Sequence, residues 1–182
     1  MKKILLFSLF FLFSAIIVLA YETIIFHFPD GELWEKAYYK KRMGEAILQY
    51  VPGGQISTNW KRTIIVHSYN YAEYSINVFS QNEIKKMMKI NPTGKYKTLR
   101  RNDNDAVFTR CTEDYKTIQA QCEFLRIAKA HEGIVTIQYI NRNKKDFENN
   151  YTLWLQVIRG AKLMNSYYRN ERTFNKSIYF EL

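Results

Sequence analysis

The sequence predicts an α+β domain in which two helices pack on a single antiparallel sheet that carries one cross-strand disulfide. Short runs rich in β-branched and aromatic residues recur along the chain, and glycine, proline or asparagine turns bound them. Two longer stretches repeat apolar residues at three- and four-residue steps, which indicates helices. The resulting order of strands, helix, strands, helix is typical of one α+β domain.

The first twenty residues have the form of a secretory signal peptide. Lys2 and Lys3 form a short positive region, and residues 4–19 are apolar apart from two serines. We expect cleavage after Ala20, export to the periplasm or the cell exterior, and a single domain over residues 21–182. An uncleaved anchor is the alternative, because sixteen mainly apolar residues fall just short of the length that spans a bilayer.

The chain is strongly basic. Its formal charge is +10, and loss of Lys2 and Lys3 with the leader leaves 25 basic against 17 acidic residues, a charge of +8. Such an excess favours anionic partners, namely an anionic polymer or a membrane surface. A simple solvated surface is the competing interpretation, because no run of four basic residues occurs. Nucleic acid is disfavoured, because exported proteins seldom meet it.

Cys111 and Cys122 are the two cysteines of the chain. An export signal places them in an oxidising compartment, where an even number of cysteines is usually paired. Each lies in an alternating run, and the polar residues 113–117 can turn the chain between the two runs. We therefore predict a disulfide between neighbouring strands.

The N-terminal half reads mainly as strands. Residues 23–28 are predicted to form a strand at a sheet edge, and residues 34–40 and 45–51 to form a hairpin. A helix over residues 32–50 is the alternative, because several apolar positions there also fit a helical stripe. A β-branched strand follows at residues 61–67.

The first helix is predicted to begin at Ser80. Ser80 and Glu83 match the capping box, in which each side chain satisfies a backbone donor, and Phe79 and Ile84 are spaced as a hydrophobic staple. Asn91, which precedes a proline, is expected to end this helix.

The C-terminal half is predicted to form a strand meander followed by a long helix. The strands are expected at residues 105–111, 118–128 and 134–141, and the helix at residues 147–168, where aromatic and aliphatic residues recur at helical spacing. Residues 177–180 fit either an edge strand or a loose tail.

One stretch carries a resemblance to known proteins. It reads Tyr50-Val51-Pro52-Gly53-Gly54-Gln55, then Asn59-Trp60 and a strand at residues 63–66. This pattern resembles small exported proteobacterial proteins of unassigned function, and the order of elements is loosely similar to PsbP-like domains. The chain departs from the pattern at Gln49, Lys61 and Arg62, where acidic residues are expected. The resemblance implies a compartment and a fold, and it brings no catalytic residues.

No motif in the sequence indicates catalysis, a cofactor or a metal. His27, His67 and His131 lie far apart and lack metal-ligand spacing, and there is no nucleophile elbow or phosphate-binding glycine loop. Acidic pairs such as Asp103 and Asp105 lie in loop-like sequence, where solvated turns are common. We therefore expect no catalytic, cofactor or metal site, although two of these carboxylates could still serve an unrecognised small hydrolase.

The remaining hypotheses concern binding. The first is a small non-catalytic binding or accessory protein that meets an envelope or extracellular protein partner. The second is a basic surface on which tyrosines and basic side chains meet a polyanion. If a partner is bound, the glycine-rich turn that ends in an aromatic side chain is the expected contact. Its residues are Gly53, Gly54, Gln55, Asn59 and Trp60. The alternative role for Trp60 is to fill the edge of the sheet.

Overall fold

The computed structural model describes residues 22–28, 31–70, 74–131, 133–165 and 177–181. The expected leader and its cleavage site lie outside the described residues. Within the described part of the chain, no helix is both long and apolar enough to cross a bilayer.

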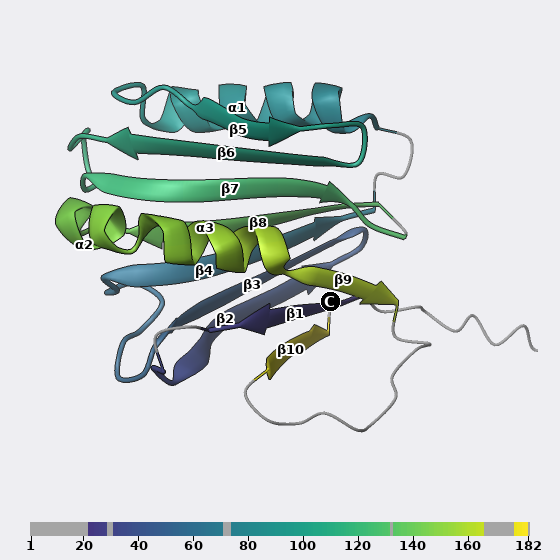
Figure 1. Cartoon of the computed structure of the whole chain (residues 1–182), viewed down its shortest axis with the longest axis horizontal. Coiled ribbons are helices and arrows are strands. Elements are labelled where there is room, and N and C mark those ends of the chain that lie inside the picture. The colour runs from purple at the N-terminus through teal and green to yellow at the C-terminus, as the bar shows by residue number, and fades with distance from the viewer. Residues whose placement is uncertain (1–21, 29–30, 71–73, 132, 166–176, 182) are drawn as a thin grey trace, which may run out of the picture.

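The main body is a seven-stranded antiparallel sheet in the order β2-β3-β4-β8-β7-β6-β5 (Figure 1). Its strands are β2 (Trp34–Arg42), β3 (Glu45–Pro52), β4 (Arg62–Tyr69), β5 (Lys97–Arg101), β6 (Asp105–Thr112), β7 (Gln121–Lys129) and β8 (Ile134–Asn141). The predicted α+β class, the first hairpin and the meander are confirmed. The alternative helix over residues 32–50 is wrong, because β2 and β3 occupy that segment.

A second, three-stranded sheet joins the two ends of the described chain. β1 (Glu22–His27) pairs antiparallel with β9 (Lys162–Asn165) and with β10 (Ser177–Glu181). The prediction of an edge position for the first strand is wrong, because β9 and β10 flank it on both sides. Ile24 of β1 is fully buried in the main core, so the small sheet packs on one face of the large one.

The helix α1 (Ile76–Ile90) begins one turn earlier than predicted. Its N-cap is Ser75, whose side chain accepts a hydrogen bond from the backbone N–H three residues on, at 3.2 Å. Ser80 lies inside the helix, fully buried, and its hydroxyl donates to the carbonyl four residues earlier at 2.6 Å. The predicted capping box of Ser80 and Glu83 is therefore wrong, whereas the predicted end at Asn91 is confirmed.

Two short helices replace the single long one that the apolar repeat predicts at residues 147–168. They are α2 (Lys144–Asn149) and α3 (Tyr151–Gly160). Asn143 caps α2 by accepting from a backbone N–H at 3.0 Å. Asn150 has φ −108° and ψ 13°, which are not helical, and separates the two helices. The apolar repeat runs through this break, because both helices face the same core.

The helix α3 ends well before the predicted boundary at residue 168. The guanidinium Nη1 of Arg126 on β7 donates to three carbonyls at this end, at 2.6 to 3.2 Å. These carbonyls belong to Ile158, Arg159 and Ala161. The chain then continues as β9, whose backbone pairs with β1 instead of extending the helix. Residues 166–168 lie outside the described part.

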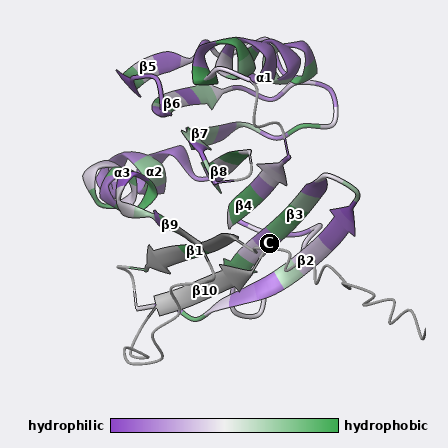
Figure 2. Cartoon of the chain, turned by 90° about the vertical axis from the view of Figure 1, so that its right-hand side faces the viewer, coloured by the Kyte–Doolittle hydropathy of each residue, from purple (hydrophilic) through white to green (hydrophobic). Residues whose placement is uncertain are grey.

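The large sheet packs on both faces but not equally. One face carries the main core beneath α2, α3 and β1, with Phe124, Tyr139 and Trp154 fully buried. The other face carries a smaller core between α1 and the strands β6 and β7. In Figure 2, α2 and α3 lie on one side of the strands, whereas α1 lies at the β6 end of the sheet, away from β2 and β3.

The predicted disulfide is confirmed. Cys111 on β6 and Cys122 on β7 lie directly opposite each other in the strand register, with Cα atoms 4.0 Å apart. The bond ties the ends of two neighbouring strands and closes the loop that the sequence predicts as polar.

Candidate functional site

The strands β2, β3 and most of β4 leave their α1-facing side half-exposed, because α1 packs mainly on β6 and β7. Only at the end of β4 does Tyr69 contact Phe79 of α1, with ring centroids 5.0 Å apart. Side chains alternate along each strand, so cross-strand partners identify those that share this side. Tyr38 pairs with Gln49, Gln49 with Ile65 and Ile65 with Gln138; Ile47 pairs with His67. We call these six residues the open face. None is fully buried, and Tyr38 is 40% exposed.

A histidine cluster closes one end of the open face. The Nδ1 of His67 lies 2.7 Å from the hydroxyl of Tyr69, and its Nε2 lies 3.8 Å from a carboxylate oxygen of Glu45. Burial lowers the pKa of His67 below its ordinary 6.5, and Glu45 and Glu83 oppose this shift. His67 therefore favours the neutral imidazole, which can donate or accept a hydrogen bond to a bound molecule.

The glycine-rich turn lies at the other end of the open face. The side-chain amide of Gln49 donates to the carbonyl of Ser57 at 3.4 Å, which brings residues 53–60 against this end of the sheet. Both glycines are exposed. Gly53 donates its N–H to a carbonyl in the segment before β2 at 2.7 Å, and Gly54 has a φ of +78°, a conformation that favours glycine.

The other three expected contact residues mostly hold the turn in place. The side-chain oxygen of Gln55 accepts from the N–H of Lys61 at 2.7 Å, and Asn59 donates its N–H within the turn at 3.1 Å. Trp60 is half-buried, and the guanidinium of Arg142 lies 3.7 Å from its ring centroid and donates to its carbonyl at 2.9 Å. The five residues thus form one ordered turn, which presents its backbone and part of the Trp60 ring.

Ile56 is the exposed apolar side chain of this turn, and it was not predicted as a contact from the sequence. Ile56 is 61% exposed, and its backbone pairs with Asn59. An isoleucine within a polar turn of glycine, serine and threonine was the signal that could have identified it. Together with the open face, residues 53–60 form what we call the candidate binding surface.

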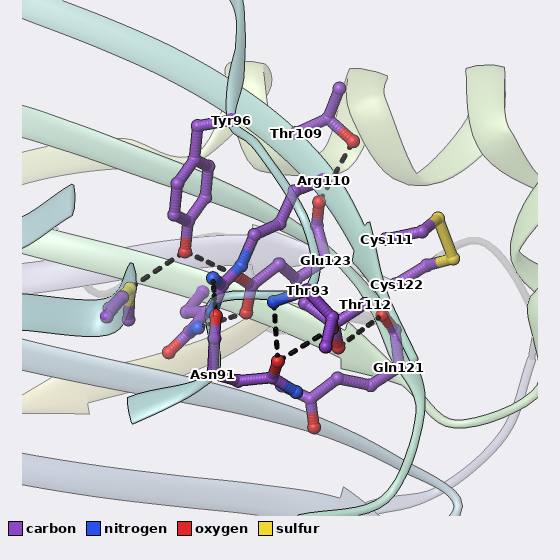
Figure 3. A network of polar contacts seen from close by, with 12 residues as sticks. Asn91, Thr93, Tyr96, Thr109, Arg110, Cys111, Thr112, Gln121, Cys122 and Glu123 are labelled. Carbon is purple, nitrogen blue, oxygen red and sulfur yellow. Dashed lines mark hydrogen bonds and ion pairs between the residues drawn. A yellow bond between two sulfur atoms is a disulfide. The ribbon is translucent and has the colours of Figure 1, made fainter. Parts of the chain in front are cut away.

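A buried polar network borders the open face (Figure 3). Glu123 on β7 is fully buried and accepts hydrogen bonds from Arg110 and Gln138, both at 2.5 Å, and from the hydroxyl of Tyr96. Arg110 also donates to the carbonyl of Asn91 at the end of α1, at 3.2 Å. Burial and the neighbouring Glu123 raise the pKa of Tyr96, which therefore stays a donor.

This network connects separate elements of the structure. Glu123 and Arg110 satisfy each other, and their remaining bonds tie the sheet to α1 and to Tyr96. The pair was not predicted from the sequence, although its signal was present. The disulfide sets the register of β6 and β7, and that register places Arg110 opposite Glu123.

The other residues considered for chemistry lie apart from one another. Asp105 is buried in ion pairs with Arg100 and Arg126, so it neutralises cations rather than pairing with the exposed Asp103. His131 lies exposed after β7, and the side chain of His27 falls outside the described part. Among the residues that the structure describes, no three His, Cys, Asp or Glu side chains gather as a metal site would require.

Comparisons with known proteins identify one similar solved structure. No protein-family model matches the chain, and no curated protein does. The solution structure of cyanobacterial PsbP (CyanoP) from Synechocystis sp. PCC 6803 aligns with 72% of this chain and 92% of its own, at 8% sequence identity and a TM-score of 0.43. This is consistent with the loose PsbP-like likeness in the order of elements. The likeness to exported proteobacterial proteins stays a prediction.

Proposed function

We propose that this protein is a small exported binding protein without a catalytic role, and that it binds a protein partner through the candidate binding surface. The observation that carries the proposal is the uneven packing of the large sheet. One face is covered by α2, α3 and β1, whereas the open face exposes an aromatic ring, two isoleucines and a histidine. Apolar and aromatic side chains at the centre of a surface are the usual anchors of a protein interface.

The surroundings of the open face support a protein partner. Ile56 adds an exposed apolar side chain at one end, while Lys40 and Lys61 add exposed charged groups around the apolar ones. An apolar centre with a polar rim is the arrangement of a protein–protein interface. The basic rim favours a partner with acidic residues at the matching positions.

A binding experiment tests this surface directly. Protein spanning residues 21–182, with its disulfide intact, would be incubated with envelope and culture-fluid fractions, and captured proteins quantified. We expect Tyr38→Ala and Ile56→Ser each to lower capture of a specific protein at least fivefold. Val78→Ser is the matched control, because Val78 is an exposed apolar residue on α1, 48% exposed. Equal capture by all three variants would contradict the proposal.

The role of Trp60 is tested in the same assay. If Trp60 contacts the partner, Trp60→Ala lowers capture as strongly as Ile56→Ser does. If it only fills the sheet edge beneath Arg142, the variant unfolds at lower urea concentration and keeps its capture.

Export is tested at the N-terminus of the protein. Expressed with its own leader, the chain should be recovered from the periplasm or medium with Tyr21 as its first residue. Recovery of a chain that begins at Met1 in the membrane fraction would instead support the anchor.

A further inference from the structure

The turn between β2 and β3 presents a fully exposed methionine on a fixed support. Met43 is 103% exposed, more than any other large apolar residue of the described chain. Gly44 follows with a φ of +79°, and its carbonyl accepts from the N–H of Asn70 at 2.8 Å. β2 and β3 are paired up to this turn, where Arg42 lies opposite Glu45. The methionine therefore projects from an ordered hairpin.

Three basic residues precede this methionine on the same hairpin. Lys40, Lys41 and Arg42 precede it directly, and all three are exposed. The nearby carboxylate of Glu45 points toward His67, 3.8 Å from Nε2. We call residues 40–43 the hairpin tip. Figure 2 shows the end of β2 as a hydrophilic segment at the rim of the molecule.

Two tyrosines stand behind the hairpin tip on opposite faces of β2. Tyr38 is 40% exposed and Tyr39 is 46% exposed. Along the strand this gives an apolar residue at the outermost point, then cations, then amphipathic rings. Proteins that touch bilayers place these groups in the same order, with apolar atoms among the acyl chains, cations at the headgroups and tyrosines at the interface.

We propose that the hairpin tip docks on an anionic lipid surface, with Met43 inserted and Lys40, Lys41 and Arg42 at the headgroups. Lysines on an edge strand also prevent edge-to-edge pairing, but that role gives no reason for a bare methionine at the turn. A soluble polyanion would be bound by the cations and would leave Met43 without a function. Tyr38 and Lys40 belong to both surfaces, but this inference does not rest on the proposed function, because it depends on the cations and Met43 at the hairpin tip and is tested with lipid vesicles alone.

Vesicle sedimentation tests the proposal. The chain from residue 21 to 182 contains every helix and strand that the structure describes, and it would be mixed with phosphatidylcholine vesicles with or without 30% phosphatidylglycerol. We expect binding to the anionic vesicles only. Replacing Lys40, Lys41 and Arg42 by Gln should weaken it about a hundredfold, from about fivefold per charge. Met43→Ser should weaken it about tenfold, because a buried methionine side chain contributes at least that factor.

A charge-matched control separates the hairpin tip from net charge. Lys85→Gln, Lys89→Gln and Lys97→Gln together remove three exposed cations from α1 and β5. This variant should bind within about threefold of the parent chain, because its charges lie away from the bilayer. An equal loss of vesicle binding in the control and the hairpin variant would overturn the proposal. So would unchanged vesicle binding by Met43→Ser together with binding of the parent chain to heparin as tight as its binding to the anionic vesicles.

Insertion is measured separately with Met43→Trp. At a fully exposed turn position this change meets no neighbouring side chain, so the fold is retained. We expect its fluorescence to shift to the blue on anionic vesicles, relative to the parent chain, and brominated lipids to quench it. An unshifted, unquenched spectrum while the protein is bound would show contact without insertion and overturn the proposal.

Discussion

The two halves of the α1-facing side of the large sheet differ in how deeply their side chains are buried. Where α1 covers β6 and β7, the side chains that face it are buried, among them Phe108, Leu125 and Ile127. Where α1 is absent, Ile47, Gln49 and Ile65 on the same side of β3 and β4 are only half-buried. Within one sheet face, the presence of a covering helix thus decides whether the side chains of a strand belong to the core or to the surface.

The charged side chains of the two halves also differ in burial. In the covered half the charged pair Arg110 and Glu123 is almost completely desolvated, so each requires the other. In the open half His67 and Glu45 are only partly buried and 3.8 Å apart, and neither depends on a single partner. The covered half is therefore sensitive to loss of one charge, and the open half can exchange its contacts with a ligand.

The largest effect should follow from breaking the buried pair. Glu123→Ala leaves Arg110 charged and unpaired in the interior, so we expect a loss of about 3–5 kcal/mol in the free energy of unfolding. The control is Glu32→Ala, which removes the exposed partner of Arg62 and should cost less than about 1 kcal/mol. Urea denaturation compares the two, and similar losses would refute the contrast between the halves.

The disulfide gives the next largest effect. Replacing Cys111 and Cys122 together by Ala removes a bond across a sequence separation of 11, and loss of its loop constraint should cost about 3 kcal/mol. Reducing the parent protein with dithiothreitol should lower its free energy of unfolding by a similar amount, and its urea midpoint should fall accordingly. An unchanged midpoint in both experiments would mean that pairing of β6 and β7 is sufficient without the bond.

A smaller effect is expected from the pH dependence of the open half. The folded-state pKa of His67 is below its ordinary 6.5, so as the pH falls through 6.5 the unfolded chain takes up a proton that the folded chain does not. Stability should therefore be complete above this pH and decrease as the pH falls toward the folded-state pKa. His67→Gln should flatten this part of the stability profile. An NMR titration that places the pKa of His67 above 6.5 would reverse the expectation.

The smallest effect on stability should come from the exposed aromatic residue of the open face. Tyr38→Ala should change the free energy of unfolding by no more than about 0.5 kcal/mol, because the side chain is 40% exposed. Phe108→Ala in the covered half removes a side chain that is 1% exposed and should cost about 3–5 kcal/mol. If the two variants lost equal stability in urea, the open face would be part of the core.

Local patterns predicted most of the strands, but they failed at helix ends, where the sequence fits more than one boundary. Ser75 and Ser80 both suit a helix start, and burial of Ile76 and Phe79 against the sheet decides in favour of Ser75. The apolar repeat also continues beyond Gly160. There the chain reaches β1 and pairs with it as β9, which no local pattern indicates.

The candidate binding surface was only partly accessible from sequence. The turn at residues 53–60 is a local feature, and its glycines and Trp60 are visible in the sequence. The open face depends on where α1 packs. The apolar pattern of α1 does not specify which strands of the sheet this helix covers. No local pattern therefore indicates that Ile47 and Ile65 stay half-exposed, as the structure has them.

The sequence by itself determined the α+β class, the first hairpin and the meander, and the pairing of the two cysteines, because alternation, turns and neighbouring strands are local properties. Only the tertiary structure decided that β1 joins the C-terminal strands, that Glu123 is buried against Arg110, and that one half of a sheet face stays open. These features depend on contacts between segments far apart in the chain, whose burial outweighs local preference.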